Sequence, residues 1–179
     1  MSTQTNLIQF KKYLLSLEQS GCYDVEKYTH SLMFQTSQLA FFFCQLVKDH
    51  NVDHTFYHVH HKPKIHTLAY FNIGRGYPKE LQDGHWCYVL KDFGYKMLIV
   101  PCTSIKENSS AINENFEMEI ETMYHHEKMH CRMQLSDMRM VDLQRLDERK
   151  PIYEVCTNKE DIKSFIKEKI FDECKEEAI

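Results

Sequence analysis

The feature that most constrains the fold of this chain is a succession of short β-forming segments that begins near residue 67. Three of them, at residues 67–73, 86–90 and 97–101, are rich in aromatic and aliphatic side chains, and turn-forming residues separate them. Two further segments, at 116–120 and 130–138, also show strand patterns. Short strands joined by tight turns are typical of a small β-barrel, which closes its sheet and leaves no edge strand open.

Helical patterns flank this region on both sides. Apolar residues recur at helical spacing over residues 6–49, and a polar break at Ser20-Gly21-Cys22 divides the run into two helices. Near the other end, Asn158 is a predicted N-cap for an amphipathic helix over residues 158–174. The predicted fold class is therefore α+β. We expect a helical extension with a histidine-rich connector over 1–60, a barrel over 66–150 and a C-terminal helix over 151–179.

Composition excludes several classes of protein. A formal net charge of −4 and a pI near 6.2 argue against a nucleic-acid coat protein with a broadly basic surface, so any RNA contact must use a local patch. The seven cysteines form no C-x-x-C pair, which predicts reduced thiols rather than a zinc or redox site. The longest apolar run, residues 39–44, is far too short to span a bilayer, and no signal-peptide pattern is present. We expect a soluble, cytoplasmic protein without membrane association.

Three blocks of sequence occur in a fixed order that resembles the MazF/PemK family of toxins. The first block comprises residues 70–74, Gly76, 80–81 and 84–90; the second is 97–104; the third is 134–146. The second block ends in a threonine-serine pair after a β-forming run, and this end also resembles the ToxN-like toxins of RNA-antitoxin systems. Together the blocks cover under half of the chain, and order and spacing carry the resemblance more than any single block.

The resemblance implies an SH3-like β-barrel that acts as the toxin of a toxin-antitoxin system. It implies a metal-independent endoribonuclease that cuts single-stranded RNA and leaves 2′,3′-cyclic phosphate and 5′-hydroxyl ends. No cofactor is expected for this chemistry. The expected partners are single-stranded RNA, a second copy of the chain in a homodimer, and an antitoxin, with a protein antitoxin expected ahead of an RNA one.

The predicted catalytic residues depart from the family at one position. In the family an arginine-proline pair opens the second strand and the arginine serves catalysis, whereas Gly84-His85 stands here. Imidazole can exchange a proton near neutral pH, but it cannot supply a permanently charged phosphate clamp. His85 is therefore the candidate acid or base, and by resemblance Thr103 would donate a hydrogen bond to the phosphate. Ser104, Ser136 and Asp137 complete the predicted catalytic set.

The predicted RNA-binding residues are of two kinds: cations that would replace the missing arginine, and aromatic side chains that would stack on bases. They are Arg75, Lys79, Arg139, Tyr77 and Trp86, with Gln134 added from the third block.

Structural alternatives stand beside these roles. Hydroxyl residues such as Thr103 and Ser104 also end strands and begin turns. We favour a turn and a helix cap as the explanation of Arg139 and Asp142. Because the family arginine is missing, the alternative function is a catalytically silent barrel that binds RNA or a protein.

Two regions outside the resemblance have open interpretations. The connector is dense in histidine, and His54, His58 and His60 could bind a metal in a regulatory protein, but no carboxylate or cysteine completes a site and none is predicted. His125-His126 with His130 is better explained as a polar loop. The apolar stripe of the N-terminal helices is interpreted as core or dimer interface, with an antitoxin-like segment folded over the RNA groove as the alternative.

Overall fold

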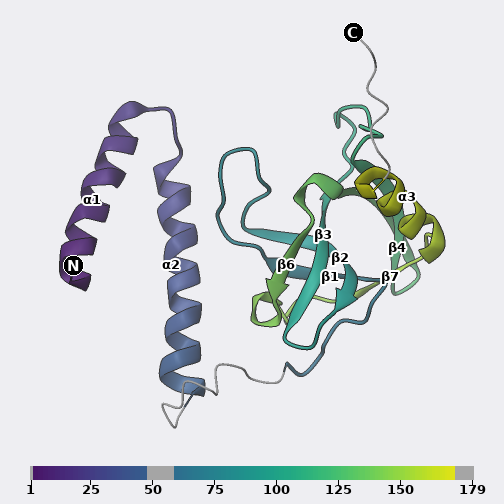
Figure 1. Ribbon diagram of the computed structural model, residues 1–179, viewed down its shortest axis with the longest axis horizontal. Helices are drawn as coiled ribbons and strands as arrows, with labels where there is room; N and C mark the ends of the chain where they lie inside the picture. The colour runs from purple at the N-terminus through teal and green to yellow at the C-terminus, as the bar shows by residue number, and fades with distance from the viewer. Residues whose placement is uncertain (1, 48–58, 172–179) are drawn as a thin grey trace. The chain divides into compact units, whose positions relative to one another are not determined.

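The computed structural model describes residues 2–47 and 59–171, and the chain divides into two compact units (Figure 1). The first unit covers Met1–Thr55 and the second covers Phe56–Ile179. The boundary between them falls in the histidine-dense connector. Most of the histidines considered there as metal ligands, including His54 and His58, lie outside the described residues.

The first unit is a helical hairpin made of α1 (Thr3–Ser20), α2 (Val25–Phe41) and the π-helical turn η1 (Phe42–Leu46). Ser2 caps the start of α1 by accepting a hydrogen bond from a backbone N–H of the first turn at 3.2 Å. Gly21 ends α1 with a positive φ of 63°, a conformation that glycine adopts without steric cost. Asp24 caps α2 in the same way as Ser2, at 2.9 Å. The predicted pair of helices, with its break at residues 20–22, is confirmed.

The second unit is an antiparallel β-barrel with one helix. Its strands are β1 (Thr67–Asn72), β2 (Gly84–Asp92), β3 (Lys96–Ser104), β4 (Glu117–Tyr124), β5 (Glu127–Gln134), β6 (Arg139–Asp142) and β7 (Tyr153–Val155). Two short 3-10 turns, η2 (Leu135–Asp137) and η3 (Leu143–Arg145), flank β6, and α3 (Lys159–Phe171) follows β7.

Six strands close the barrel in the order β1-β2-β3-β5-β4-β7, and β7 returns to pair with β1. The long strand β3 pairs with β2 along one edge, and its other edge is shared between β6 in its first half and β5 in its last three residues. A sheet closed in this way satisfies the backbone groups of both edges. The predicted small β-barrel is therefore confirmed.

Some strand bounds differ from the prediction. Strand β5 ends at Gln134, and the residues predicted to continue it, 135–138, form the 3-10 turn η2 and its C-cap Met138 before the new strand β6 begins. The helix expected after Asp142 is only the 3-10 turn η3, which Asp142 caps by accepting from the Gln144 N–H at 2.8 Å. Residues His125 and His126, expected in a polar loop, form the two-residue turn between β4 and β5 with positive φ angles of 47° and 69°.

Two apolar clusters hold the barrel together, and alternate residues of β1 and β2 feed them. Leu68 and Tyr88 belong to a cluster that draws on β1, β2, β3, β4, β5, β7 and α3. Their neighbours Ala69 and Cys87 belong to a second cluster that draws on β1, β2, β3 and β6. Both faces of β1 and β2 are therefore buried, which explains why these strands are continuously apolar rather than alternating.

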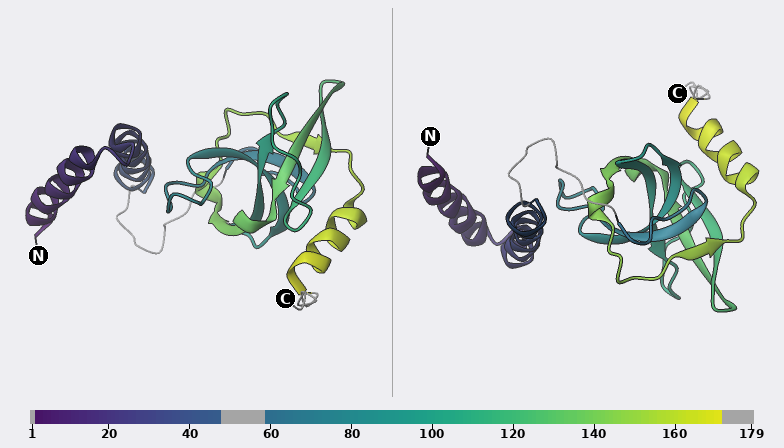
Figure 2. Two further views of the ribbon diagram at one scale, coloured as in Figure 1. Left: turned by 90° about the horizontal axis from the view of Figure 1, so that it is seen from above. Right: turned by 90° about the horizontal axis from the view of Figure 1, so that it is seen from below.

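Helix α3 packs on the first of these clusters. Its first turn is capped by Asn158, whose Oδ1 accepts from the Glu160 N–H at 2.8 Å, and Ile162 and Ile166 are buried. Figure 2 shows α3 beside the strands rather than within the sheet. The predicted amphipathic helix is confirmed in its position and its buried face. Among the helices of residues 2–47 and 59–171, none is long and apolar enough to cross a bilayer.

Candidate functional site

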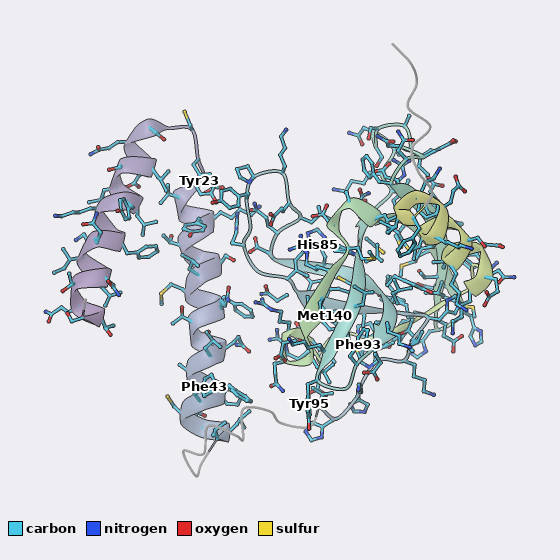
Figure 3. All side chains as sticks on the ribbon, viewed as in Figure 1. Tyr23, Phe43, His85, Phe93, Tyr95 and Met140 are labelled. Atoms are coloured by element: carbon cyan, nitrogen blue, oxygen red, sulfur yellow. The ribbon has the colours of Figure 1, made fainter. Side chains whose placement is uncertain are left out.

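The first two predicted catalytic residues stand just beyond the end of the pairing between β2 and β3. The last paired positions of these strands are Trp86 and Cys102, so His85 and Thr103 come next, one on each strand. Because side chains alternate along a strand, His85 and Thr103 lie on the same face. Both are half-buried, and Figure 3 labels His85 on the barrel. Their predicted roles in catalysis stay predictions.

Gln134 holds the Thr103 side chain in place. The Gln134 amide nitrogen donates to the Thr103 Oγ1 at 3.1 Å and to the Glu117 Oε1 at 2.9 Å. Gln134 is only 8% exposed, so this amide is a buried link between β3, β4 and β5. The contact of Gln134 with RNA stays a prediction. In this structure the Gln134 amide N–H groups are used in the hydrogen bonds to Thr103 and Glu117.

Arg132 is a cation at this site that sequence analysis missed. On β5 it is the direct partner of Thr103 across the strand pair, so the two side chains share a face. Its Nε lies 3.0 Å from the Glu119 Oε1, and its Nη1 lies 3.9 Å from the Glu117 Oε2. The Arg132 side chain is 11% exposed, and Nη1 also donates to the Ser110 carbonyl at 2.6 Å. We call His85, Thr103, Glu117, Arg132 and Gln134 the Thr103 site.

A sequence signal for Arg132 was present but weak. Arg132 stands two residues before Gln134, at the spacing that puts both on one face of a strand. The third block of the resemblance begins at Gln134, so Arg132 fell just outside it.

The loop between β1 and β2 carries three predicted RNA-binding residues in different environments. Arg75 is 7% exposed, and its guanidinium pairs with the Asp83 carboxylate through Nη2–Oδ2 at 3.0 Å and Nε–Oδ1 at 3.2 Å. It therefore braces the loop. Tyr77 is 82% exposed, and Lys79 is also exposed, so these two are accessible to a ligand.

Asp137 fastens this loop to turn η2. Its Oδ1 accepts from the Leu81 N–H at 2.8 Å and from the Arg139 Nη2 at 3.1 Å, and its side chain is 12% exposed. Ser136 is exposed and donates to the same carboxylate at 3.4 Å. This geometry gives Asp137 and Arg139 a bracing role, which agrees with the structural alternative stated for Arg139.

Two other predicted residues lie on the opposite face from Thr103. Ser104 follows Thr103 on β3, so alternation turns it away. Trp86 likewise follows His85 on β2 and packs edge to face against Tyr70 and Tyr153, with ring centroids 5.3 and 4.5 Å apart. The structure therefore does not bring Trp86 and His85 together.

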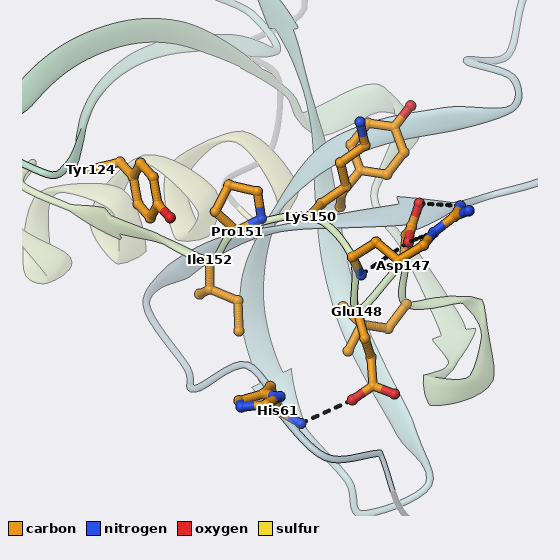
Figure 4. A pocket seen from close by; sticks show the side chains of 10 residues that line it. His61, Tyr124, Asp147, Glu148, Lys150, Pro151 and Ile152 are labelled. Atoms are coloured by element: carbon orange, nitrogen blue, oxygen red, sulfur yellow. Dashed lines mark hydrogen bonds and ion pairs between the residues drawn. The ribbon is translucent and has the colours of Figure 1, made fainter.

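A pocket of about 440 Å³ opens where the chain bulges between η3 and β7 (Figure 4). Tyr70 and Tyr124 contribute aromatic walls, and the Lys150 Nζ lies 5.6 Å from the Tyr70 ring centroid. One ion pair lies on its charged rim: Arg149 donates to Asp147 at 2.7 and 2.8 Å, an interaction that holds the pKa of the Asp147 carboxyl below its usual value. The pocket is thus a second, mixed-polarity surface.

The thiol nearest His85 is chemically quiet. Cys87 is fully buried and donates to the His85 carbonyl at 3.4 Å. Burial raises the pKa of the Cys87 thiol far above its ordinary value, so it stays neutral and is no nucleophile. Within the described parts of the chain, no three histidine, cysteine or carboxylate side chains gather as a metal site.

No protein-family model matches this sequence, and a comparison with curated proteins found no relative. Residues 2–47 and 59–171 define a class of architecture: an α+β protein in which a closed six-stranded antiparallel barrel carries a polar site, with α1 and α2 before it and α3 after it. Function must therefore be argued from the Thr103 site.

Proposed function

We propose that this protein is a metal-independent endoribonuclease of the MazF/PemK type, with an SH3-like barrel that cuts single-stranded RNA. The observation that carries the proposal is the placement of Thr103 on the middle one of three adjacent strands. Arg132 stands opposite it on β5, and His85 stands on β2, one position beyond the last residues that β2 and β3 pair and on the same face. A proton-transfer group and a cation thus flank one hydroxyl, as cleavage by the neighbouring 2′-hydroxyl requires.

The hydrogen bond from Gln134 orients the Thr103 hydroxyl for this task. Because the Gln134 amide donates to the Thr103 Oγ1, the hydroxyl hydrogen is left to donate elsewhere. A non-bridging phosphate oxygen is the acceptor that we assign to it. His85 would take the proton of the attacking 2′-hydroxyl or give one to the leaving 5′-oxygen.

Arg132 is the cation that we assign to the role of the missing arginine, in place of the predicted Arg75, Lys79 and Arg139. Its guanidinium carries a permanent charge and a planar fork of donors that suits a phosphate, which His85 cannot provide. Glu117 and Glu119 hold the fork in place in the free protein. An incoming phosphodiester would exchange with one of these carboxylates as the partner of the guanidinium.

The same carboxylates favour a second candidate, a barrel that binds RNA or a protein without turnover. With Glu119 at 3.0 Å and Glu117 at 3.9 Å, Arg132 is surrounded by more negative than positive charge. A phosphodiester must overcome that repulsion, which makes weak or absent cleavage the specific expectation of this alternative.

The remaining parts of the proposal follow from the resemblance. As a toxin the protein would act in the cytoplasm, form a homodimer and be silenced by an antitoxin, a protein before an RNA. Tyr77 and Lys79, both exposed on the β1–β2 loop, are the RNA contacts that the geometry supports best.

The test is incubation of the full chain with a long single-stranded RNA in EDTA, followed by mapping of the new ends. We expect discrete cuts with 5′-hydroxyl ends, and a loss of about 10²-fold or more in rate for His85→Ala, Thr103→Val and Arg132→Gln. Lys128→Gln is the matched control, because it removes an exposed cation from the same strand, β5, next to the β4–β5 turn and away from Thr103. It should cut at the wild-type rate.

Each other outcome has a defined meaning. RNA that is bound but stays intact favours the silent barrel. Cleavage that persists in Arg132→Gln and Thr103→Val would remove the Thr103 site from the mechanism. Unfolding curves followed by the fluorescence of Trp86, the single tryptophan of the chain, check that each variant keeps its barrel.

A further inference from the structure

The helical hairpin leaves its apolar side chains uncovered. Within the described residues, α1 and α2 contain no buried residue. Twelve large apolar side chains of the hairpin are between 38% and 69% exposed: Leu7, Ile8, Phe10, Tyr13, Leu15, Leu17, Met33, Phe34, Leu39, Phe41, Phe43 and Leu46. Figure 3 shows Phe43 projecting from the end of the second helix.

Helix α2 is apolar on two opposite sides. One side carries Val25, Tyr28 and Leu32, which recur at intervals of three and four residues and are half-buried, as a seam against α1 requires. The other side carries Met33, Phe34, Ala40 and Phe41, in two pairs spaced by seven residues, and all four are exposed. We call these four residues the outer stripe of α2. A helix that is apolar on both sides needs a partner on each.

The exposed apolar area of the whole hairpin is of the size that a stable interface buries. A large apolar side chain that is about half exposed presents roughly 80–100 Å², so the twelve present roughly 1,000 Å², of which the outer stripe of α2 contributes about a quarter and the other side chains of both helices the rest. A standard interface buries about 800 Å² on each partner. Helices of this length are marginal alone, so their stability must come from packing.

Charge indicates which partner fits. Residues 3–46 contain three lysines and three acidic residues, so the hairpin is formally neutral. RNA, an acidic peptide or an anionic membrane would find no complementary charge there. A second copy of the hairpin carries no net charge that would repel the first. Its outer stripe also has the same apolar pairs at a spacing of seven residues.

We propose that the outer stripe of α2 packs against the outer stripe of a second copy, so that two hairpins form an antiparallel four-helix bundle with two-fold symmetry. Such a contact is isologous, with the same patch used on both chains. The bundle tethers two barrels, so two Thr103 sites can meet one RNA. The proposal does not rest on nuclease activity.

The test is sedimentation velocity of the full chain over a concentration series, for wild type, Phe41→Glu, Phe41→Leu and Gln9→Glu. We expect a wild-type dimer and at least a 100-fold rise in the dimer dissociation constant for Phe41→Glu, because the interface would bury an unpaired carboxylate. Phe41→Leu keeps an apolar side chain and should stay dimeric. Gln9→Glu places the same charge on the exposed surface of α1, outside the outer stripe, and should change the constant less than about threefold.

Three outcomes would overturn the proposal. If the wild type is a monomer at about 100 μM and its hairpin resists protease, another part of the same chain covers the outer stripe. If the wild type is a monomer and its hairpin is cut by protease, the partner of the outer stripe is a different protein. A dimer equally stable in Phe41→Glu would place the contact in the barrel. Because Trp86 lies in the barrel, its fluorescence shows whether Phe41→Glu leaves that unit folded.

Discussion

The barrel and the helical hairpin differ in how much of their apolar surface they bury. In the barrel Phe71, Val89 and Ile99 have no exposed surface, whereas α1 and α2 of the hairpin bury no residue and its π-helical turn η1 buries only Phe42, which is 8% exposed. The two units have comparable apolar content in their regular elements. Closure of a sheet and the packing of α3 cover apolar side chains from several directions, while a pair of helices covers one side of each. Apolar composition alone therefore does not say whether a segment forms a core.

The two units also differ in the range of the interactions that define them. Helices α1 and α2 begin at Ser2 and Asp24, side chains that cap the first turn within three residues. The barrel depends on pairs far apart in sequence, such as β1 with β7 and the Asp137 carboxylate with the Leu81 N–H. Local capping defines the ends of an element, but only distant contacts create a buried site.

The largest expected difference between the units is in the reactivity of their thiols. Cys22 in the hairpin turn is exposed, whereas Cys87 and Cys102 in the barrel are buried, and burial raises the pKa of both barrel thiols. We expect native Cys22 to be alkylated at least about 10³-fold faster, because the barrel thiols react only when the barrel opens. Peptide mass spectrometry after timed iodoacetamide pulses measures the rates. Rates within tenfold of each other would show that the barrel core is open.

The second largest expected difference between the units is the loss of stability when one apolar side chain is truncated. Phe71→Ala removes a fully buried ring and should lower the free energy of unfolding of the barrel by about 3–5 kcal/mol. Leu7→Ala, at a position 62% exposed in the hairpin, should change the free energy of unfolding by less than about 0.5 kcal/mol. Urea unfolding followed by Trp86 fluorescence measures both. Equal effects would contradict the contrast between a packed barrel and an uncovered hairpin.

Within the barrel, the β1–β2 loop is predicted to depend on Asp137. Asp137→Ala removes the acceptor for the Leu81 N–H and the partner of Arg139, so it should cost about 1–3 kcal/mol. It should also speed proteolysis within residues 74–83. Ser136→Ala, the control, removes only an exposed hydroxyl and should have little effect on stability. If the loop is cut no faster in Asp137→Ala, Asp137 does not hold it.

The smallest effect is a pH dependence at His66. Burial first, and then the charge of Lys159, lowers the pKa of His66, whose Nδ1 lies 3.0 Å from the Tyr88 hydroxyl. The His66 imidazole therefore takes up a proton less readily in the folded state than in the unfolded chain, where its pKa is about 6.5. This contribution to stability is fully present above that pH and is lost as the pH falls.

His66→Asn isolates that contribution. Asparagine tolerates the positive φ of 69° at this position and does not titrate. The stability of the variant should depend less on pH between about 7 and 5 than that of wild type, in urea unfolding at each pH. An identical dependence would assign the acid sensitivity to other groups. The helical signal of the hairpin should not change.

Sequence reasoning recovered part of the Thr103 site and missed part. His85 and Thr103 came from the resemblance, and both stand one position beyond the last pair of β2 and β3, on the same face. Arg132 was missed, because its role depends on β5 pairing with the end of β3, and nothing local to Arg132 reports that pairing. Trp86 was grouped with the RNA-binding residues, but strand alternation turns it to the other face.

The amino-acid sequence by itself determined the local elements of this protein: the two capped helices, the run of short strands and the amphipathic α3. Those features depend on periodicity, caps and turn residues that lie within a few positions of one another. Only the tertiary structure decided the closure of the barrel, the bracing of Arg75 by Asp83 and the meeting of Thr103 with Arg132 and Gln134. Each of these joins residues through the pairing or folding of the chain, and hydrogen bonds of that kind leave no periodic trace in a single sequence.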